Sequence, residues 1–474
     1  MKDRHLWRWA IPGLLLLNVL LKFWALGLNE LAGDEPFTVY WAQRPLAELF
    51  GMLRTENNPP LYFLFMHGWS ALVPLDAAWL RVPSAVFSIL TVWPLFLIGK
   101  RLVGPLAGLT AALLFTLSNH SLGFAHEVRA YSLLALACTW AVWQLVYLSD
   151  FDKPIGFRKN GLRGGTILWL VAANVLAVWA HYFGWLMVGI ELVLVFAVPL
   201  LRPVRVKMLA AAGITALLSL PWAGVVLARA GESLRRGTWV DVPTWEEPYN
   251  MLMRWSNAPV VAVLFLVLIA LALARGKARS MQVPLLWNGL PLIGMFAISF
   301  VVPVYIDRYL YFASPAFYLL VAMAATVQLN SRQPVWLLPA GAVLGMFATF
   351  TPWKSNGIHP SAVKAQVEAW REGNTTVMIQ PEWYDLTYGW QLDPVLFKGA
   401  APIAIALHER GIFPIPAAEM PALDSTVATV VHIDSWASLT DPGHEVLNEL
   451  RKRYTQVDSV EADKKVMVRR FRKR

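Results

Sequence analysis

Ionisable side chains occur at four places that directly adjoin long apolar stretches of the sequence. They are Asp34-Glu35, Glu127 with Arg129 and Tyr131, His181-Tyr182, and Asp307 with Arg308 and Tyr309. A carboxylate can accept the proton of an attacking hydroxyl group. The planar guanidinium of arginine keeps its charge at any relevant pH and suits a phosphate leaving group. If the four places meet in one cavity, these residue types fit displacement at a sugar carbon with departure of a lipid phosphate.

The composition is that of a membrane protein. Of the 474 residues, 57% are hydrophobic and 15% are charged, whereas an ordinary soluble domain carries about a quarter charged residues. The net charge of +10 does not indicate a nucleic-acid partner, because the basic residues fall mostly in short loops between apolar runs. The single cysteine, Cys138, excludes an intramolecular disulfide and any cysteine-rich metal site.

The apolar runs predict a polytopic, all-α membrane protein with about eleven transmembrane helices, since a span needs about 20 mostly apolar residues. The expected spans are 10–28, 79–99, 104–120, 130–148, 165–181, 183–201, 206–228, 258–274, 284–304, 310–328 and 334–351. The segment 61–74 is apolar but short and follows Pro59 and Pro60. We expect it to form a surface helix within the first large outer loop, residues 29–78.

Loop charges orient these spans. With the N-terminus inside, the inside loops carry basic residues and little acid beyond Asp150 and Asp152. The basic residues are Lys100, Arg101, Lys153, Arg158, Lys159, Arg163, Arg202, Arg205, Lys207, Arg275, Lys277, Arg279 and Arg332. Cytoplasmic loops have this positive bias. The orientation predicts a multi-pass protein of the cytoplasmic (inner) membrane, with the four ionisable places on the extracytoplasmic or periplasmic side.

An odd number of spans puts the C-terminal residues outside as well. Alternating runs of β-branched residues at 375–380 and 426–433 predict strands. A helix is expected over 444–454 and a final strand over 464–471. We therefore expect a transmembrane catalytic domain over 1–351 and a small extracytoplasmic α/β domain over 352–474.

Six stretches of the chain, in order, resemble motifs of the GT-C glycosyltransferases, specifically the protein mannosyltransferase and aminoarabinose transferase-like group. They are GDEPFTVYWA (33–42), ENNPPLYFLF (56–65), LRVPSAVFSILTV (80–92), HEVRAYSLLAL (126–136), AHYFGWL (180–186) and DRYLYFASPAF (307–317). The resemblance implies a GT-C fold with surface helices over an outward cavity. It also implies a polyprenyl-phosphate sugar donor and an inverting, direct displacement onto an acceptor hydroxyl.

The resemblance also assigns roles to individual residues. Asp34 matches the acid of the first outer loop and is the expected general base, and Glu35 beside it is expected to position the acceptor. The other expected site residues are Arg129 and Arg308 at the donor phosphate, Tyr131 and Tyr309 around that pocket, and Glu127, His181, Tyr182, Asn58, Tyr62 and Asp307 as further substrate contacts. Many relatives have histidine where this chain has Asn58, so an ionic role at that position is absent here.

Simpler structural roles remain as alternatives for several of these residues. Asp34 could only cap the helix that begins at Pro36, and Glu127 with Arg129 could be an interfacial ion pair. Arg308 could extend to lipid headgroups, and His181 could be an interhelical hydrogen-bond partner. We expect no cofactor. The alternative is a divalent metal ion bound by Asp34 and Glu35.

Two functions from different classes fit the pattern. The first is a hexosyl- or pentosyltransferase that modifies a glycolipid, polysaccharide or protein of the cell envelope, such as lipopolysaccharide, from a lipid-linked donor. The second is a lipid or sugar flippase, which should show polar residues throughout the bilayer depth. Here the polar residues cluster at one face, with Glu191 the main exception, and we expect Lys22 to extend from the first span to the interface.

Overall fold

The computed structural model describes residues 3–149, 164–236, 238–327, 334–399, 401–416, 420, 423 and 426–474. The chain forms two compact units, each assembled from separate stretches. The first unit comprises Met1–Ala25, Phe50–Tyr62 and Arg81–Pro352, and the second comprises Leu26–Leu49, Phe63–Leu80 and Trp353–Arg474. The inside-loop residues between Asp150 and Arg163, Arg332 and the end of the expected tenth span lie outside the described residues.

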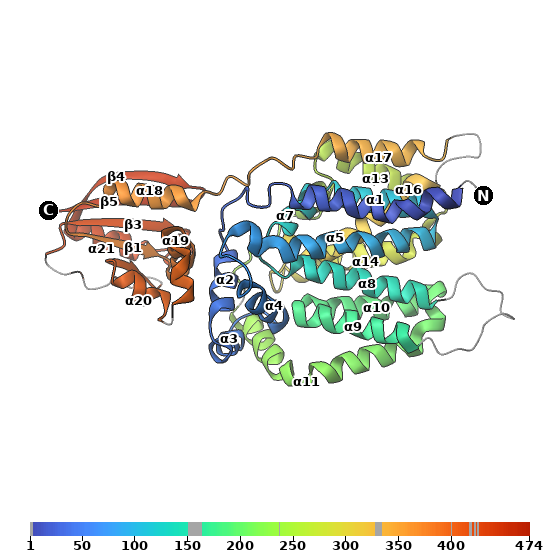
Figure 1. The fold of residues 1–474 in the computed structure, drawn as a ribbon, viewed down its shortest axis with the longest axis horizontal. Helices are drawn as coiled ribbons and strands as arrows, with labels where there is room; N and C mark the ends of the chain where they lie inside the picture. The colour runs from blue at the N-terminus through green and yellow to red at the C-terminus, as the bar shows by residue number, and fades with distance from the viewer. Residues whose placement is uncertain are drawn as a thin grey trace. The chain divides into compact units, whose positions relative to one another are not determined.

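The first unit is helical (Figure 1). Its helices are α1 (Asp3–Phe23), α5 (Ala77–Leu102), α6 (Pro105–Thr116), α7 (Asn119–Ala125), α8 (Tyr131–Leu148), α9 (Gly164–Ala180), α10 (Phe183–Ala197), α11 (Arg205–Arg236), α12 (Glu247–Trp255), α13 (Pro259–Ala274), α14 (Ala278–Ile298), α15 (Asp307–Leu310), α16 (Ser314–Val327) and α17 (Leu337–Ala348). Short 3₁₀ turns, η2 (Pro199–Val204) and η3 (Tyr311–Ala313), join some of them. Helix α9 packs against α8, α10 and α11.

Among the described residues, five helices are long and apolar enough to cross a membrane, and α12 with α13, bent by 97°, would make a sixth. Five shorter apolar helices also occur, at Ile11–Phe23, Pro105–Thr116, Ile167–Ala180, Phe183–Ala197 and Leu337–Ala348. The multi-pass helical class is therefore confirmed, while the count of eleven spans stays a prediction. The apolar run at 206–228 is only part of α11, because Arg229 pairs with Glu232 on the next turn and the helix continues to Arg236.

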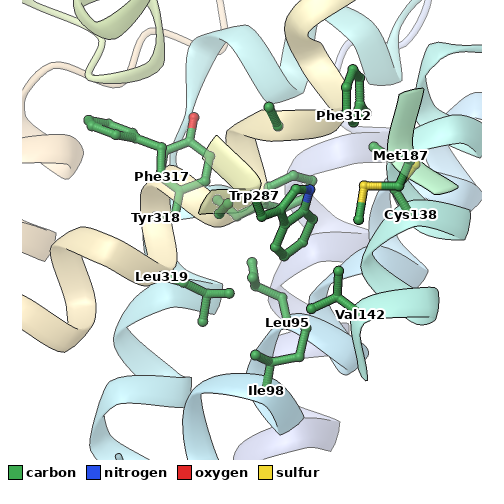
Figure 2. Packing of buried hydrophobic residues seen from close by; sticks show 14 of the residues in the cluster. Leu95, Ile98, Cys138, Val142, Met187, Trp287, Phe312, Phe317, Tyr318 and Leu319 are labelled. Atoms are coloured by element: carbon green, nitrogen blue, oxygen red, sulfur yellow. The ribbon is translucent and has the colours of Figure 1, made fainter. Parts of the chain in front are cut away.

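Buried aromatic and aliphatic side chains fill the first unit (Figure 2). Trp287 of α14 is completely buried and is surrounded by residues of other helices, among them Leu95, Val142 and Phe312. Helices α5 and α6 approach closely at Gly108, where an added Cβ would lie 2.3 Å from the carbonyl oxygen of Phe96. Small residues permit such close packing between membrane helices, which lack a hydrophobic driving force for association.

The second unit contains a five-stranded mixed sheet in the order β2-β1-β3-β5-β4 (Figure 1). The strands are β1 (Thr375–Gln380), β2 (Ile412–Pro414), β3 (Thr429–Ser435), β4 (Tyr454–Asp463) and β5 (Val466–Lys473). The helices and turns are α2 (Glu35–Gln43), α18 (Pro360–Trp370), η4 (Glu382–Tyr384), α19 (Asp385–Leu392), η5 (Pro394–Lys398), α20 (Ile403–His408), η6 (Ala437–Leu439) and α21 (Glu445–Arg453). β1 runs parallel to β2 and β3, and β5 runs antiparallel to β3 and β4. The expected small α/β domain is present.

The first outer loop is helical, as expected. It contains α2 together with α3 (Leu46–Leu53) and α4 (Pro60–Ser70), and α4 overlaps the segment 61–74 predicted to be a surface helix. Its position on a membrane surface stays a prediction, and so does the domain boundary at 351/352. By contacts within the chain, residues 26–49 cluster with the C-terminal α/β residues.

Burial gives the C-terminal residues a pH-dependent stability. It raises the pKa of Asp385, the first residue of α19, from 3.8 to about 7. The folded protein then holds a proton that the unfolded chain lacks, so stability falls as the pH rises between those values. We expect Asp385→Asn to raise the midpoint of thermal unfolding at pH 8, because the folded protein no longer buries a carboxylate. Each kcal/mol of free energy gained in this way should raise the midpoint by about 2–4 °C. The rise should be much smaller at pH 5, and equal rises at both pH values would contradict this account.

Candidate active site

An aromatic cluster in the first unit brings together three of the four places that the sequence singles out. The ring of His181 lies 5.7 Å from Tyr131 and 5.6 Å from Tyr309, measured between centroids. Phe183 stacks on His181 at 5.3 Å and lies 4.9 Å from Tyr309. Side chains from the start of α8, from the turn between α9 and α10 and from α15 therefore meet at one point. We call His181, Tyr131, Tyr309 and Phe183 the ring cluster.

A tight turn between α9 and α10 sets the position of His181. An added Cβ at Gly184 would lie 2.3 Å from the carbonyl carbon of Ala177, so only glycine fits where the two helices meet. The Nδ1 atom of His181 accepts a hydrogen bond from the Phe183 amide at 3.3 Å. The neutral imidazole therefore carries its proton on Nε2, which can donate.

Arg129 lies beside the ring cluster, in a turn that is held by hydrogen bonds from other residues. Its guanidinium lies 5.8 Å from the ring centre of Tyr131 and donates to Oδ1 of Asn58 at 3.4 Å. The backbone carbonyl of Arg129 accepts from the Ser84 hydroxyl at 3.3 Å, and that hydroxyl also bonds to the buried phenol of Tyr62 at 2.9 Å. The expected contacts Asn58 and Tyr62 thus hold Arg129.

Arg308 approaches the ring cluster from α15. Its guanidinium lies 5.1 Å from the ring centre of Trp239. Asp307 beside it forms an ion pair with Arg254 at 3.3 Å and accepts the Arg308 amide hydrogen at 2.8 Å. Asp307 therefore orients the turn that carries Arg308. Neither Trp239 nor Arg254 was expected from the sequence, because each lies in a short polar segment without a motif.

The two arginines make the ring cluster electropositive. Burial, and then the charges of Arg129 and Arg308, lower the pKa of His181 to about 3. His181 lies between the two helices and stays neutral at physiological pH. Two guanidinium groups close enough to His181 to contribute to its lowered pKa are suited to attract an anion such as phosphate.

Tyr182 and Glu127 lie apart from the aromatic contacts of the ring cluster. The hydroxyl of Tyr182 accepts a hydrogen bond from the indole of Trp222 on α11 at 3.3 Å. Trp222 lines an apolar cavity of about 230 Å³ together with Trp179 and Trp185. Glu127 is partly exposed in the turn that precedes α8.

The expected general base, Asp34, belongs to the second unit. It is exposed and occupies the N-cap position of α2, after Gly33 with φ +59°. Its side chain accepts no capping hydrogen bond from the first turn, which removes the interaction that defines the simpler capping role. Glu35 is 7% exposed. That both acids act with the arginines of the first unit stays a prediction.

Lys22 corrects one expectation. It does not extend to the interface, because it is completely buried and its ammonium donates to the Ser121 hydroxyl of α7 at 2.9 Å. His126, which the sequence did not single out, bonds through Nε2 to the carbonyl of Lys22 at 2.8 Å. Within the described residues, no group of three histidine, cysteine or acidic side chains is arranged to hold a metal ion.

The chain shares its architecture with solved structures but not its sequence with known families. No family model matches the chain, and no curated protein sequence matches it. Solved structures do match, and they confirm at the level of the fold the resemblance that the motifs carry.

Three of these structures belong to two proteins. ArnT, the aminoarabinose transferase from Cupriavidus metallidurans, bound to undecaprenyl phosphate, aligns with a TM-score of 0.60 over 97% of each chain at 13% identity. The oligosaccharyltransferase AglB from Archaeoglobus fulgidus, in complex with an inhibitory peptide and a dolichol-phosphate, aligns with a TM-score of 0.56 at 11% identity. That alignment covers 96% of this chain and 73% of AglB. A complex of the A. fulgidus enzyme with Zn and sulfate aligns with a TM-score of 0.57.

Proposed function

We propose that this protein is a membrane glycosyltransferase that moves a sugar from a polyprenyl-phosphate donor to a hydroxyl of an extracytoplasmic acceptor. The observation that carries the proposal is the pair Arg129 and Arg308 at the ring cluster, in a fold whose solved examples hold undecaprenyl phosphate and dolichol-phosphate. A guanidinium pair suits the phosphate of the donor, and tyrosine rings suit a sugar or the first isoprene units.

The proposed reaction is a direct displacement. The acceptor oxygen attacks the anomeric carbon while the bond from that carbon to the phosphate oxygen breaks, which inverts the configuration. Asp34 takes the acceptor proton, and Glu35 positions the acceptor. The departing polyprenyl phosphate keeps the bonding electrons, and Arg129 and Arg308 stabilise its charge. In this proposal the arginines supply the positive charge, and no metal is required.

The location of the reaction follows from the loop charges. We propose that the acid loop and the ring cluster act on the extracytoplasmic side of the cytoplasmic membrane, where nucleotide sugars are absent and the donor must be lipid-linked. The basic residues of the expected inside loops support this orientation. A cytoplasmic location of a tag inserted at residue 32 would exclude it.

The direct test is transfer by the purified protein in lipid nanodiscs. Polyprenyl-phosphate sugars are offered with envelope glycolipids as acceptors, and release of polyprenyl phosphate is measured with and without EDTA. We expect release from a lipid-phosphate sugar, none from a nucleotide sugar, and no effect of EDTA. Movement of the lipid-linked sugar across the bilayer without its cleavage would instead establish a flippase.

A further inference from the structure

Residues on both sides of the acidic pair Asp34-Glu35 form hydrogen bonds with the C-terminal part of the chain. We call residues 29–44 the acid loop. Ahead of the pair, both carboxylate oxygens of Glu30 bind Ser361, one accepting its amide hydrogen at 2.9 Å and the other its hydroxyl hydrogen at 2.6 Å. Asn29 accepts the amide hydrogen of Asn356 at 3.0 Å. The acid loop is thus attached at the start of α18.

Behind the pair, a buried arginine makes the second attachment. Arg44 ends α2 and is only 3% exposed. Its Nη1 donates to the carbonyl oxygens of Gly399 at 2.6 Å and Ala401 at 3.3 Å, while Nε donates to Glu48 at 2.9 Å. Charge-assisted bonds of this kind are roughly twice as strong as neutral ones, and removing the arginine takes the donor away from both carbonyl groups.

Tyr40 strengthens the same attachment from within α2. Its hydroxyl accepts the amide hydrogen of Ile403 at 3.4 Å, at the start of α20. Its ring lies edge-on to Phe397 of η5 at 5.4 Å and carries the Arg44 guanidinium at 5.5 Å. The segment from η5 to α20 therefore contacts one side of α2.

These contacts lie on both sides of the acidic pair along the chain. Asp34 occupies the N-cap position of the nine-residue helix α2, and Arg44 occupies its C-cap position. A helix held at its far end, with the preceding residues also held, fixes the direction in which its first residue points.

We propose that residues 353–474 clamp the acid loop and thereby position Asp34 for catalysis, with Arg44 and Glu30 as the positioning residues. The catalytic part of this inference rests on the proposed function. The C-terminal α/β residues are then part of the catalytic apparatus, and an acceptor that binds to them can change the position of the base. A displacement of about 1 Å in a reacting group can cost about 10²-fold in rate.

The test uses the full-length protein with Arg44→Ala, Arg44→Lys and Glu30→Gln. The matched control is Arg469→Ala, which removes an arginine that pairs with Asp434 at 2.6 Å in the same sheet but has no bond to the acid loop. Hydrogen exchange is followed on peptides that cover 29–43, and kcat, the acceptor KM and the donor Kd are measured separately.

The clamp predicts faster exchange confined to the acid loop in Arg44→Ala and a fall in kcat of about 10²-fold. The donor Kd should not change, and Arg44→Lys should recover part of the rate. Unchanged exchange in Arg44→Ala, or faster exchange with wild-type kcat, would overturn the proposal. If Arg469→Ala lowered kcat equally, general loss of the fold would be the cause. Faster exchange in a protein whose wild type transfers no sugar would retain the clamp and reject the proposed function.

Discussion

Asp34→Asn is expected to lower turnover at least 10²–10⁴-fold, the usual contribution of a general base, while the protein stays folded and keeps its donor. Asparagine caps a helix about as well as aspartate does, and Asp34 makes no capping bond in any case. The substitution therefore removes the proton acceptor without the loss of a helix cap. Single-turnover kinetics with a saturating polyprenyl-phosphate sugar, together with the donor Kd, would measure both effects.

Asp76→Asn is the matched control for this result. Asp76 is also an exposed aspartate at a helix start, and it does cap α5 by accepting the amide hydrogens of Ala78 at 3.0 Å and Trp79 at 3.4 Å. We expect its turnover to stay near that of wild type. Wild-type turnover in Asp34→Asn would remove Asp34 from the mechanism, and the buried Glu35 would become the next candidate for the base.

Arg129→Ala and Arg308→Ala are expected to weaken donor binding as well as turnover. A lost hydrogen bond to a charged group corresponds to about 1.5–3 kcal/mol, which is about 10–100-fold in the donor Kd. Turnover should fall further, because the phosphate gains charge as it leaves. Titration of the detergent-solubilised protein with undecaprenyl phosphate would measure the binding, and a donor-saturated assay would measure turnover.

Arg254→Ala provides the comparison for the two arginines. Arg254 is more exposed than Arg129 or Arg308 and pairs with Asp307, but it makes no ring contact with the cluster among the described residues. Its loss should cost less in donor affinity than the loss of Arg308. Compared with the alanine variants, Arg129→Lys and Arg308→Lys should keep part of the donor affinity through their charge. They lack the planar, two-pronged geometry of the guanidinium group. Equal affinities in all of these variants would place the donor phosphate elsewhere.

Much of the first unit could be predicted because its pattern is physical and local. Apolar runs of span length predict helices, and costly charges at their ends predict a site. The same reasoning indicated that Arg129, Tyr131, His181 and Tyr309 share one face, and the structure brings them together.

The remaining features depend on partners that are distant in the sequence. From the sequence Lys22 resembles an interfacial lysine, yet inside the unit it donates a hydrogen bond to Ser121, about a hundred residues later in the chain. Arg44 resembles an ordinary surface residue, yet the two carbonyl groups that accept its hydrogen bonds lie more than 350 residues away. No periodicity or motif encodes such pairs, because each is created only when separate stretches pack together.

The central claim is sugar transfer from a lipid phosphate, and mass spectrometry of envelope glycans and glycolipids tests it most directly. A deletion strain is compared with strains restored by the wild-type gene or by Asp34→Asn. The account predicts that one sugar disappears from one envelope component and that only the wild type restores it. Unchanged glycans and glycolipids in the deletion strain, together with a lost movement of lipid-linked sugar across the membrane, would contradict it and favour transport.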